Sequence, residues 1–91
     1  MAEQRLPYIQ HLDYRYLRYI RLIRNKTQKQ LGELMGVEKS TVSKLENEQL
    51  EFTEYYEKRL REAILRMRIS NSELAYIREL IMKKDKKKGN V

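Results

Sequence analysis

The chain has 91 residues, no cysteine and a net charge of +7, from 20 basic and 13 acidic side chains. This length suits one domain, and the lack of cysteine excludes disulfides and thiolate metal sites. The longest stretch without Asp, Glu, Lys or Arg runs only from Leu6 to Leu12, whereas a membrane-spanning helix needs about 20 apolar residues.

The first predicted helix lies between Asp13 and Asn25. The Asp13 carboxylate can accept the free amides of a first turn. Leu17, Ile20 and Ile23 are spaced by three residues and predict one inward apolar face. Asn25 tolerates the left-handed conformation, so we expect the helix to end near it.

A second helix is predicted to begin at Thr27, because Thr27 and Gln30 have the spacing of a capping box. Gly32 falls inside this helix, where glycine costs about 1 kcal/mol relative to alanine. Close approach of a neighbouring helix would explain it. Gly36 then supplies a turn, and a third helix is expected over about 38–47.

The third predicted helix has two distinct faces. Val42 and Leu45 are expected to face inward as anchors. The outward side chains are polar or basic, and they are Lys39, Ser40, Ser43 and Lys44.

After a loop at 47–52, Thr53 is expected to cap a longer fourth helix. Its predicted apolar stripe consists of Phe52, Tyr56, Leu60, Ala63, Ile64 and Met67. Ser70 and Glu73 have the spacing of a second capping box, which predicts a fifth helix.

The fifth helix carries Leu74, Ile77 and Ile81 on one face. Little core remains for this face to cover, so we expect it to be the surface of a homodimer. Residues 83–91 are rich in lysine and are expected to form a flexible tail. The predicted fold is therefore all-α, a compact bundle of about five helices in a single domain at 1–82.

Charge is unevenly distributed along the chain. Residues 15–44 hold eight basic and two acidic side chains, a net charge of +6, and residues 45–57 hold five acidic and no basic side chains. The basic block coincides with the two-helix segment 27–47, as expected if that face meets phosphates.

The polar face of the third helix suits the major groove of DNA, which is wide enough to admit an α-helix. Lysine can donate to guanine, and serine or threonine can donate or accept. The expected base-reading residues are Lys39, Ser40, Thr41 and Lys44. Residues near the start of the second helix can meet a phosphate, and the expected contacts with the DNA backbone come from Thr27, Gln28, Lys29 and Ser43.

The segment TQKQLGELMGVEKSTVSKLEN (27–47) resembles the helix-turn-helix of the phage repressor and Cro family, also called the Xre family. The matching positions are Leu17, Ile20, Arg21, Thr27, Gln28, Leu31, Gly32, Gly36, Val42, Leu45, Glu46 and Asn47. The resemblance covers about residues 13–69 and implies a bundle of four or five helices. It also implies that Gln28 touches the DNA backbone, that Lys39, Ser40 and Lys44 face base edges, and that Arg21 pairs with Glu46.

Four positions depart from the family pattern. Lys26 stands where an apolar residue is usual, and Glu38 stands at the usual Ser or Thr cap. Glu48 replaces the glycine that follows Glu-Asn, and Glu51 comes soon after. The family's loop often approaches the DNA backbone here, but phosphates would repel two carboxylates, so that contact is not expected in this chain.

The sequence therefore predicts a cytoplasmic regulator of transcription, of bacterial or phage type and repressor-like, that binds double-stranded operator DNA as a homodimer. The alternative is an antitoxin or adaptor whose main role is to bind another protein, since the acidic stretch 46–57 could meet a basic partner. His11 has no second ligand or paired acid nearby in sequence, and no glycine-rich phosphate loop is present. Neither an enzyme nor a cofactor or metal site is expected, and the first twelve residues do not suggest a signal peptide.

Overall fold

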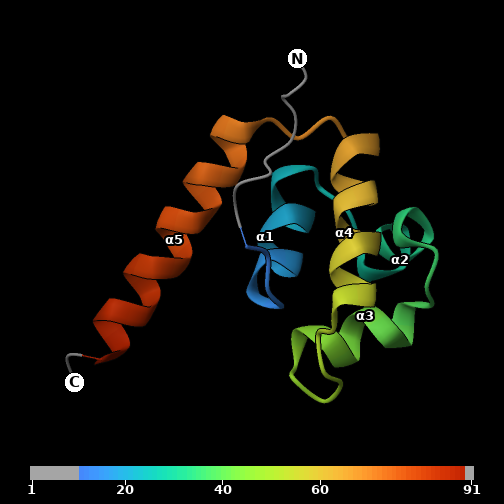
Figure 1. The fold of residues 1–91 in the computed structure, drawn as a ribbon, viewed down its shortest axis with the longest axis horizontal. Coiled ribbons are helices and arrows are strands. Elements are labelled where there is room, and N and C mark those ends of the chain that lie inside the picture. The colour runs from blue at the N-terminus through green and yellow to red at the C-terminus, as the bar shows by residue number, and fades with distance from the viewer. Residues whose placement is uncertain (1–10, 90–91) are drawn as a thin grey trace.

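A computed structural model describes the backbone of residues 11–89 and the side chains of residues 11–84. This part of the chain is all-α, as predicted. Its helices are α1 (Arg15–Ile23), α2 (Gln28–Met35), α3 (Lys39–Glu46), α4 (Glu54–Arg66) and α5 (Asn71–Gly89). Helix α2 packs against α3 and α4, and α1 packs against α3 and α5. In Figure 1, α5 lies along one side of the bundle, with α1 between it and α4.

Local sequence signals set the ends of α1 and α2. The Asp13 carboxylate accepts the backbone N–H of Arg15 at 2.9 Å, where α1 begins. Asn25 adopts a left-handed φ of 54° just after α1, as the sequence predicted. The capping box of α2 is complete, since the Thr27 side chain accepts from the Gln30 N–H and the Gln30 side chain accepts from the Thr27 N–H.

The later helices begin in two different ways. Ser70 and Glu73 form the predicted second capping box, with hydrogen bonds of 2.9 and 3.1 Å. Thr53 occupies the N-cap position of α4, but its side chain makes no capping hydrogen bond. Acidic side chains in the first turn, Glu54 and Glu57, instead suit the positive end of the helix dipole.

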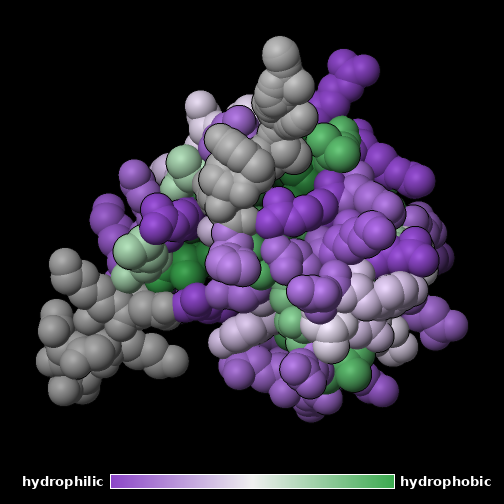
Figure 2. Space-filling view, in the orientation of Figure 1, coloured by the Kyte–Doolittle hydropathy of each residue, from purple (hydrophilic) through white to green (hydrophobic). Residues whose placement is uncertain are grey.

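The hydrophobic core draws on every helix. Its buried residues are Leu12, Tyr16, Leu17, Ile20, Leu31, Met35, Val42, Leu45, Leu60, Ala63, Ile64, Ile69, Leu74, Ile77 and Ile81. Figure 2 shows that hydrophilic side chains cover most of one face, with hydrophobic ones in small separate areas. Among the described residues, no helix combines the length and the apolar character that crossing a bilayer requires.

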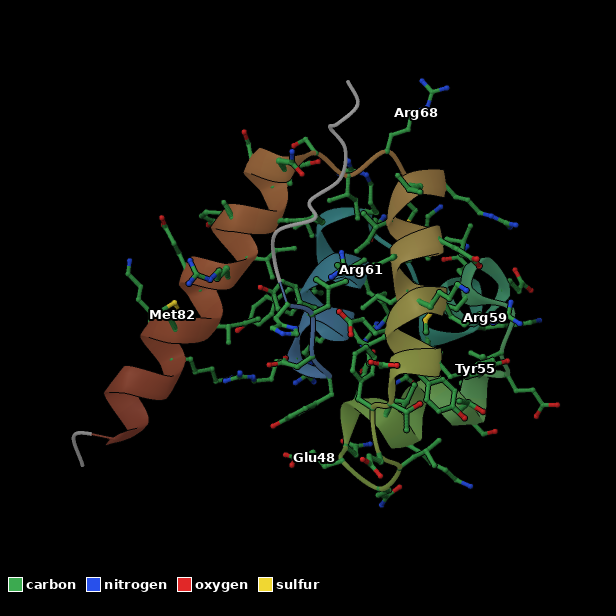
Figure 3. All side chains as sticks on the ribbon, in the orientation of Figure 1. Glu48, Tyr55, Arg59, Arg61, Arg68 and Met82 are labelled. Atoms are coloured by element: carbon green, nitrogen blue, oxygen red, sulfur yellow. The ribbon has the colours of Figure 1, made fainter. Side chains whose placement is uncertain are left out.

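The expected dimer surface on α5 is corrected by the structure. Leu74, Ile77 and Ile81 are 1%, 0% and 5% exposed, so they belong to the core of the subunit. The reason is that α1 packs against α5 as well as against α3. The apolar face of α5 therefore covers the side of α1 that α3 leaves open. The large apolar side chains that α5 does expose are Tyr76 and Met82, the latter pointing away from the bundle in Figure 3.

Helix α5 also runs further than the apolar pattern predicted. A flexible tail is expected from residue 83 on the sequence pattern, whereas the helix continues to Gly89. Lysine is a good helix former, and no proline or glycine interrupts the segment before Gly89. Residues 90–91 of the expected tail lie outside the described part of the chain.

A bidentate ion pair joins α1 to the end of α3. Arg21 Nε donates to Glu46 Oε2 at 2.8 Å, and Nη2 donates to Oε1 at 3.0 Å. The two side chains are only 16% and 8% exposed. Arg21 Nη1 also donates to the carbonyl of Lys26 at 3.3 Å, so the pair organises the turn before α2 as well.

A second bidentate pair joins the end of α1 to the start of α5. Arg24 donates two hydrogen bonds of 2.8 Å to the Glu73 carboxylate, and two more to the carbonyls of Met67 and Arg68. The Arg24 guanidinium, with the Ser70 backbone N–H, lowers the pKa of Glu73 from 4.5 to about 2. This carboxylate therefore helps to fix α5 against the rest of the bundle.

We expect removal of either partner in the first ion pair to destabilise the protein. Arg21→Ala or Glu46→Ala leaves a largely buried charge unpaired, and each should lower the free energy of unfolding by about 3 kcal/mol. The double variant should cost less than the sum of the two, as measured by urea unfolding. For comparison, Glu62→Ala breaks a weak exposed contact of 4.0 Å with Arg59 and should cost below about 1 kcal/mol. Strictly additive losses would contradict the coupling.

The second ion pair should give the stability of the protein an acid dependence. The pKa of Glu73 is lower in the folded state than in the unfolded state, so its contribution is complete above pH 4.5 and is lost as pH falls toward 2. Glu73→Gln keeps a capping acceptor but removes the charge. The difference in unfolding free energy between wild type and this variant should be largest near neutral pH and shrink steadily in that acid range.

The matched control for this acid dependence is Glu79→Gln. Glu79 is exposed on the same helix and has no ion pair among the described side chains. Urea unfolding of both variants across the pH range should separate them. An equal acid dependence for the two would count against the Arg24–Glu73 pair as its source.

Candidate nucleic-acid interface

Helices α2 and α3 pack closely about a tight turn. Gly36 ends α2 with a left-handed φ of 77°, which glycine adopts without strain. A Cβ added at Gly32 would lie 2.8 Å from the carbonyl oxygen of Val37 and 3.3 Å from the carbonyl carbon of Glu38. The predicted close approach at Gly32 is therefore real, and it is made by the backbone that leads into α3.

The start of α4 covers this turn from outside. The Arg59 guanidinium lies 5.1 Å from the centroid of the Tyr55 ring, and its Nη1 atom would be 3.1 Å from a Cβ added at Gly36. Tyr55 also packs edge-on against Tyr56. Figure 3 shows Tyr55 and Arg59 together on the side of α4 nearest the turn. The sequence did not predict that Arg59 would lie over Gly36, because no local pattern relates these two distant positions.

Helix α3 has one fully buried face and one open face. Val42 and Leu45 are 0% exposed and anchor the helix to the core. On the opposite side, Lys39, Ser40 and Lys44 are exposed. Thr41 and Ser43 are half-buried at the edges of this face. The open face of α3 thus carries hydrogen-bond donors and positive charge on a rigid support.

The start of α2 presents a more constrained set of side chains. Lys29 is exposed, whereas the Thr27 hydroxyl accepts a hydrogen bond within the capping box. Gln28 is half-buried, and its Nε2 donates to Glu46 Oε1 at 3.1 Å. The resemblance did not predict this bond. It joins α2 to the ion pair between α1 and α3 and fixes the orientation of the Gln28 amide.

Carboxylates lie at both ends of α3. Glu38 occupies the N-cap position without a side-chain capping bond. In the loop after α3, Glu48 has a left-handed φ of 59°, and Glu51 and Glu54 are exposed beyond it. A hydrogen bond with Glu48 is the main cause that raises the pKa of Tyr14. Figure 3 shows Glu48 at the beginning of this loop, next to the end of α3.

A pocket of about 370 Å³ lies beside the motif, between α1, the end of α3 and α5. Its lining residues are Tyr14, Arg15, Arg18, Tyr19, Arg21, Gln28, Glu46, Asn47, Ile81 and Lys84. The sequence analysis counted three of these arginines in the basic block but assigned no site to Arg15 or Arg18. Their spacing of three residues on α1 places them near one face, which is a signal that could have found them. Nothing in the sequence indicated that Lys84 would join them.

Comparison with known proteins matched one segment of the chain. Residues 17–53 match the family model described as Helix-turn-helix. No curated protein and no solved structure matched the chain. The matched segment contains most of α1, all of α2 and α3, and the acidic loop, whereas α4 and α5 lie beyond it. Residues 17–53 therefore form a helix-turn-helix of the phage repressor and Cro (Xre) type, and this supports a DNA-binding regulatory role.

Proposed function

We propose that this protein is a sequence-specific regulator of transcription that reads the major groove of double-stranded DNA with α3. The observation that carries the proposal is the open face of α3, where Lys39, Ser40 and Lys44 are exposed while Val42 and Leu45 are fully buried. A helix held in this way can enter the groove without exposing its apolar side. Thr41, at the edge of this face, completes the proposed set of base-reading residues.

The proposed contacts with the DNA backbone differ in how freely they can act. Lys29 is exposed and can approach a phosphate directly. Gln28 keeps one amide N–H beyond the bond that it donates to Glu46, so it can hold a phosphate in a fixed position. Thr27, whose side chain caps α2, would approach a phosphate from the start of that helix. Ser43 would approach one from the edge of the open face of α3.

We further propose that the protein acts as a homodimer and a repressor in the cytoplasm. One helix-turn-helix contacts one half-site, and two copies place their reading helices about 34 Å apart on a pseudo-palindrome. Repression is the simplest outcome for a small DNA-binding protein that occupies an operator.

A second candidate function is binding to another protein, as an antitoxin or adaptor does. The exposed glutamates of the loop after α3, Glu48 and Glu51, together with Glu54 at the start of α4, favour it because they offer an acidic surface beside the motif. A stoichiometric complex with the product of a neighbouring gene, together with no DNA binding by the free protein, would select this candidate. Sequence-selective DNA binding by the free protein would instead support the first candidate function, regulation of transcription.

We expect Lys39→Ala/Lys44→Ala to abolish recognition of duplexes selected from a random-sequence pool. Each lost base contact costs about 1–3 kcal/mol, so the double variant should bind selected sites at least about 30-fold more weakly. Its preference over unrelated duplexes should also disappear. Fluorescence anisotropy measures both affinities, and thermal melting checks the fold.

The matched control for the reading residues is Lys58→Ala/Arg66→Ala. Both side chains are exposed on α4, outside the proposed reading helix α3, and the change in net charge is the same. This control should keep the ratio between selected and unrelated sites. An unchanged ratio in the Lys39/Lys44 variant would show that α3 does not read the bases.

The same selection tests the homodimer. We expect the recovered sites to contain two inverted half-sites, with centres about one helical turn apart or a multiple of it. Sedimentation of the protein–DNA complex should give two chains per duplex. A single half-site bound by one chain would contradict the proposed dimer but not the proposal that α3 reads the bases.

A further inference from the structure

The pocket between α1, the end of α3 and α5 is rich in positive charge. Four cationic side chains line it, Arg15, Arg18, Arg21 and Lys84, against one carboxylate, Glu46. It borders the DNA-facing motif, because Gln28 at the start of α2 and Asn47 at the end of α3 belong to the same lining. A negatively charged group that reaches Gln28 would therefore stand at the edge of this pocket.

Two of the four cations are engaged within the protein. Arg21 forms the ion pair with Glu46, and Arg15 pairs with Asp13 at 2.6 Å. Arg18 and Lys84 are both exposed, and neither forms an ion pair with a described side chain. These two cations come from different helices, and they are available to an external anion.

The loop that follows α3, next to this pocket, carries the reverse charge. Tyr14 lines the basic pocket on one side and, on the other, a smaller hollow of about 170 Å³ that Glu48 and Glu51 also line. Exposed Glu54 follows at the start of α4. Phosphates would be repelled from this loop and attracted toward α1 and α5, so the charges favour one path for the DNA backbone over the other.

We propose that this pocket binds the phosphodiester backbone of DNA flanking the sequence that α3 reads, with Arg18 and Lys84 as the contacting cations. The proposal rests on the function proposed above and extends the DNA-binding surface beyond the matched segment to α5. The guanidinium of Arg18 can hold two phosphate oxygens at once, and the Lys84 ammonium adds a mobile point charge.

Backbone contacts of this kind have a recognisable signature. They neutralise phosphates and release counterions, so they steepen the fall of affinity with salt concentration. They carry no sequence information, so they strengthen the binding of the protein to selected and to unrelated duplexes alike. They also require DNA long enough to extend past the bases that α3 contacts.

The test measures duplex binding over a series of salt concentrations for Arg18→Ala and Lys84→Ala. The probes are a duplex recovered by selection, the same duplex shortened to the bases read, and an unrelated duplex of equal length. On the long duplexes, each variant should lower the slope of log affinity against log salt by about 0.9 and leave the ratio of selected to unrelated affinity unchanged. On the shortened duplex, wild type and variants should have the same slope.

Three variants serve as controls. Lys83→Ala and Arg66→Ala remove exposed cations that do not line the pocket, and both should keep the wild-type slope. Arg18→Lys preserves the charge and should also keep it. Thermal melting of each variant verifies the fold, and the exposed positions of the substituted side chains favour full folding.

The outcomes separate this inference from the function on which it rests. A wild-type protein that prefers no duplex refutes the proposed function. A wild-type protein that binds selectively while Arg18→Ala and Lys84→Ala keep its salt slope overturns the pocket assignment alone. The same conclusion follows if Lys83→Ala lowers the slope as much as Lys84→Ala, or if the pocket variants weaken binding of inorganic phosphate without changing the slope for duplex DNA.

Discussion

The geometry of the proposed DNA-binding surface depends on the Glu46 carboxylate and the groups that surround it. Its two oxygens accept hydrogen bonds from Arg21 of α1 and from Gln28 of α2, while Glu46 itself ends α3. Three helices therefore meet at one charged group that is almost completely shielded from water. A charge in this position is tolerated only when its partners are well oriented, so the arrangement restricts how α3 can turn relative to α1 and α2.

Close to that carboxylate, α2 and the start of α3 pack so tightly that the two helices have little freedom to shift relative to each other. The backbone of residues 37 and 38 sits against Gly32 at a distance that excludes a Cβ, and Arg59 of α4 covers the turn at Gly36. The core side of α3 is fully buried through Val42 and Leu45. The exposed lysines and serine of α3 are consequently presented on a rigid element, which is what recognition of base edges in a groove requires.

Helix α5 lies outside the matched segment and yet contributes both to the core and to the basic pocket. Its apolar face closes the core against α1, with Arg24 and Glu73 fixing its start. Its polar end brings Lys84 to the pocket that Arg18 shares. The loop after α3 places acidic side chains next to that pocket. The proposed DNA-binding surface thus has a basic and an acidic part, and the basic part is assembled from elements far apart in sequence.

The motif and most helix ends could be predicted from the sequence alone because the signals are local. Capping boxes act between residues three apart, left-handed positions at Asn25 and Gly36 follow from residue type, and an inward stripe follows from helical periodicity. Tertiary structure decided what each apolar face covers. The apolar stripe of Leu74, Ile77 and Ile81 would look the same in the sequence whether it covered a core or a dimer surface. Only the packing of α5 against α1 places these residues in the core. The contacts of Arg24 with Glu73 and of Arg59 with the turn likewise join residues many positions apart, and so does the pocket that Lys84 lines together with the arginines of α1. Such contacts depend on the relative placement of helices, and periodicity along a chain carries no information about that placement.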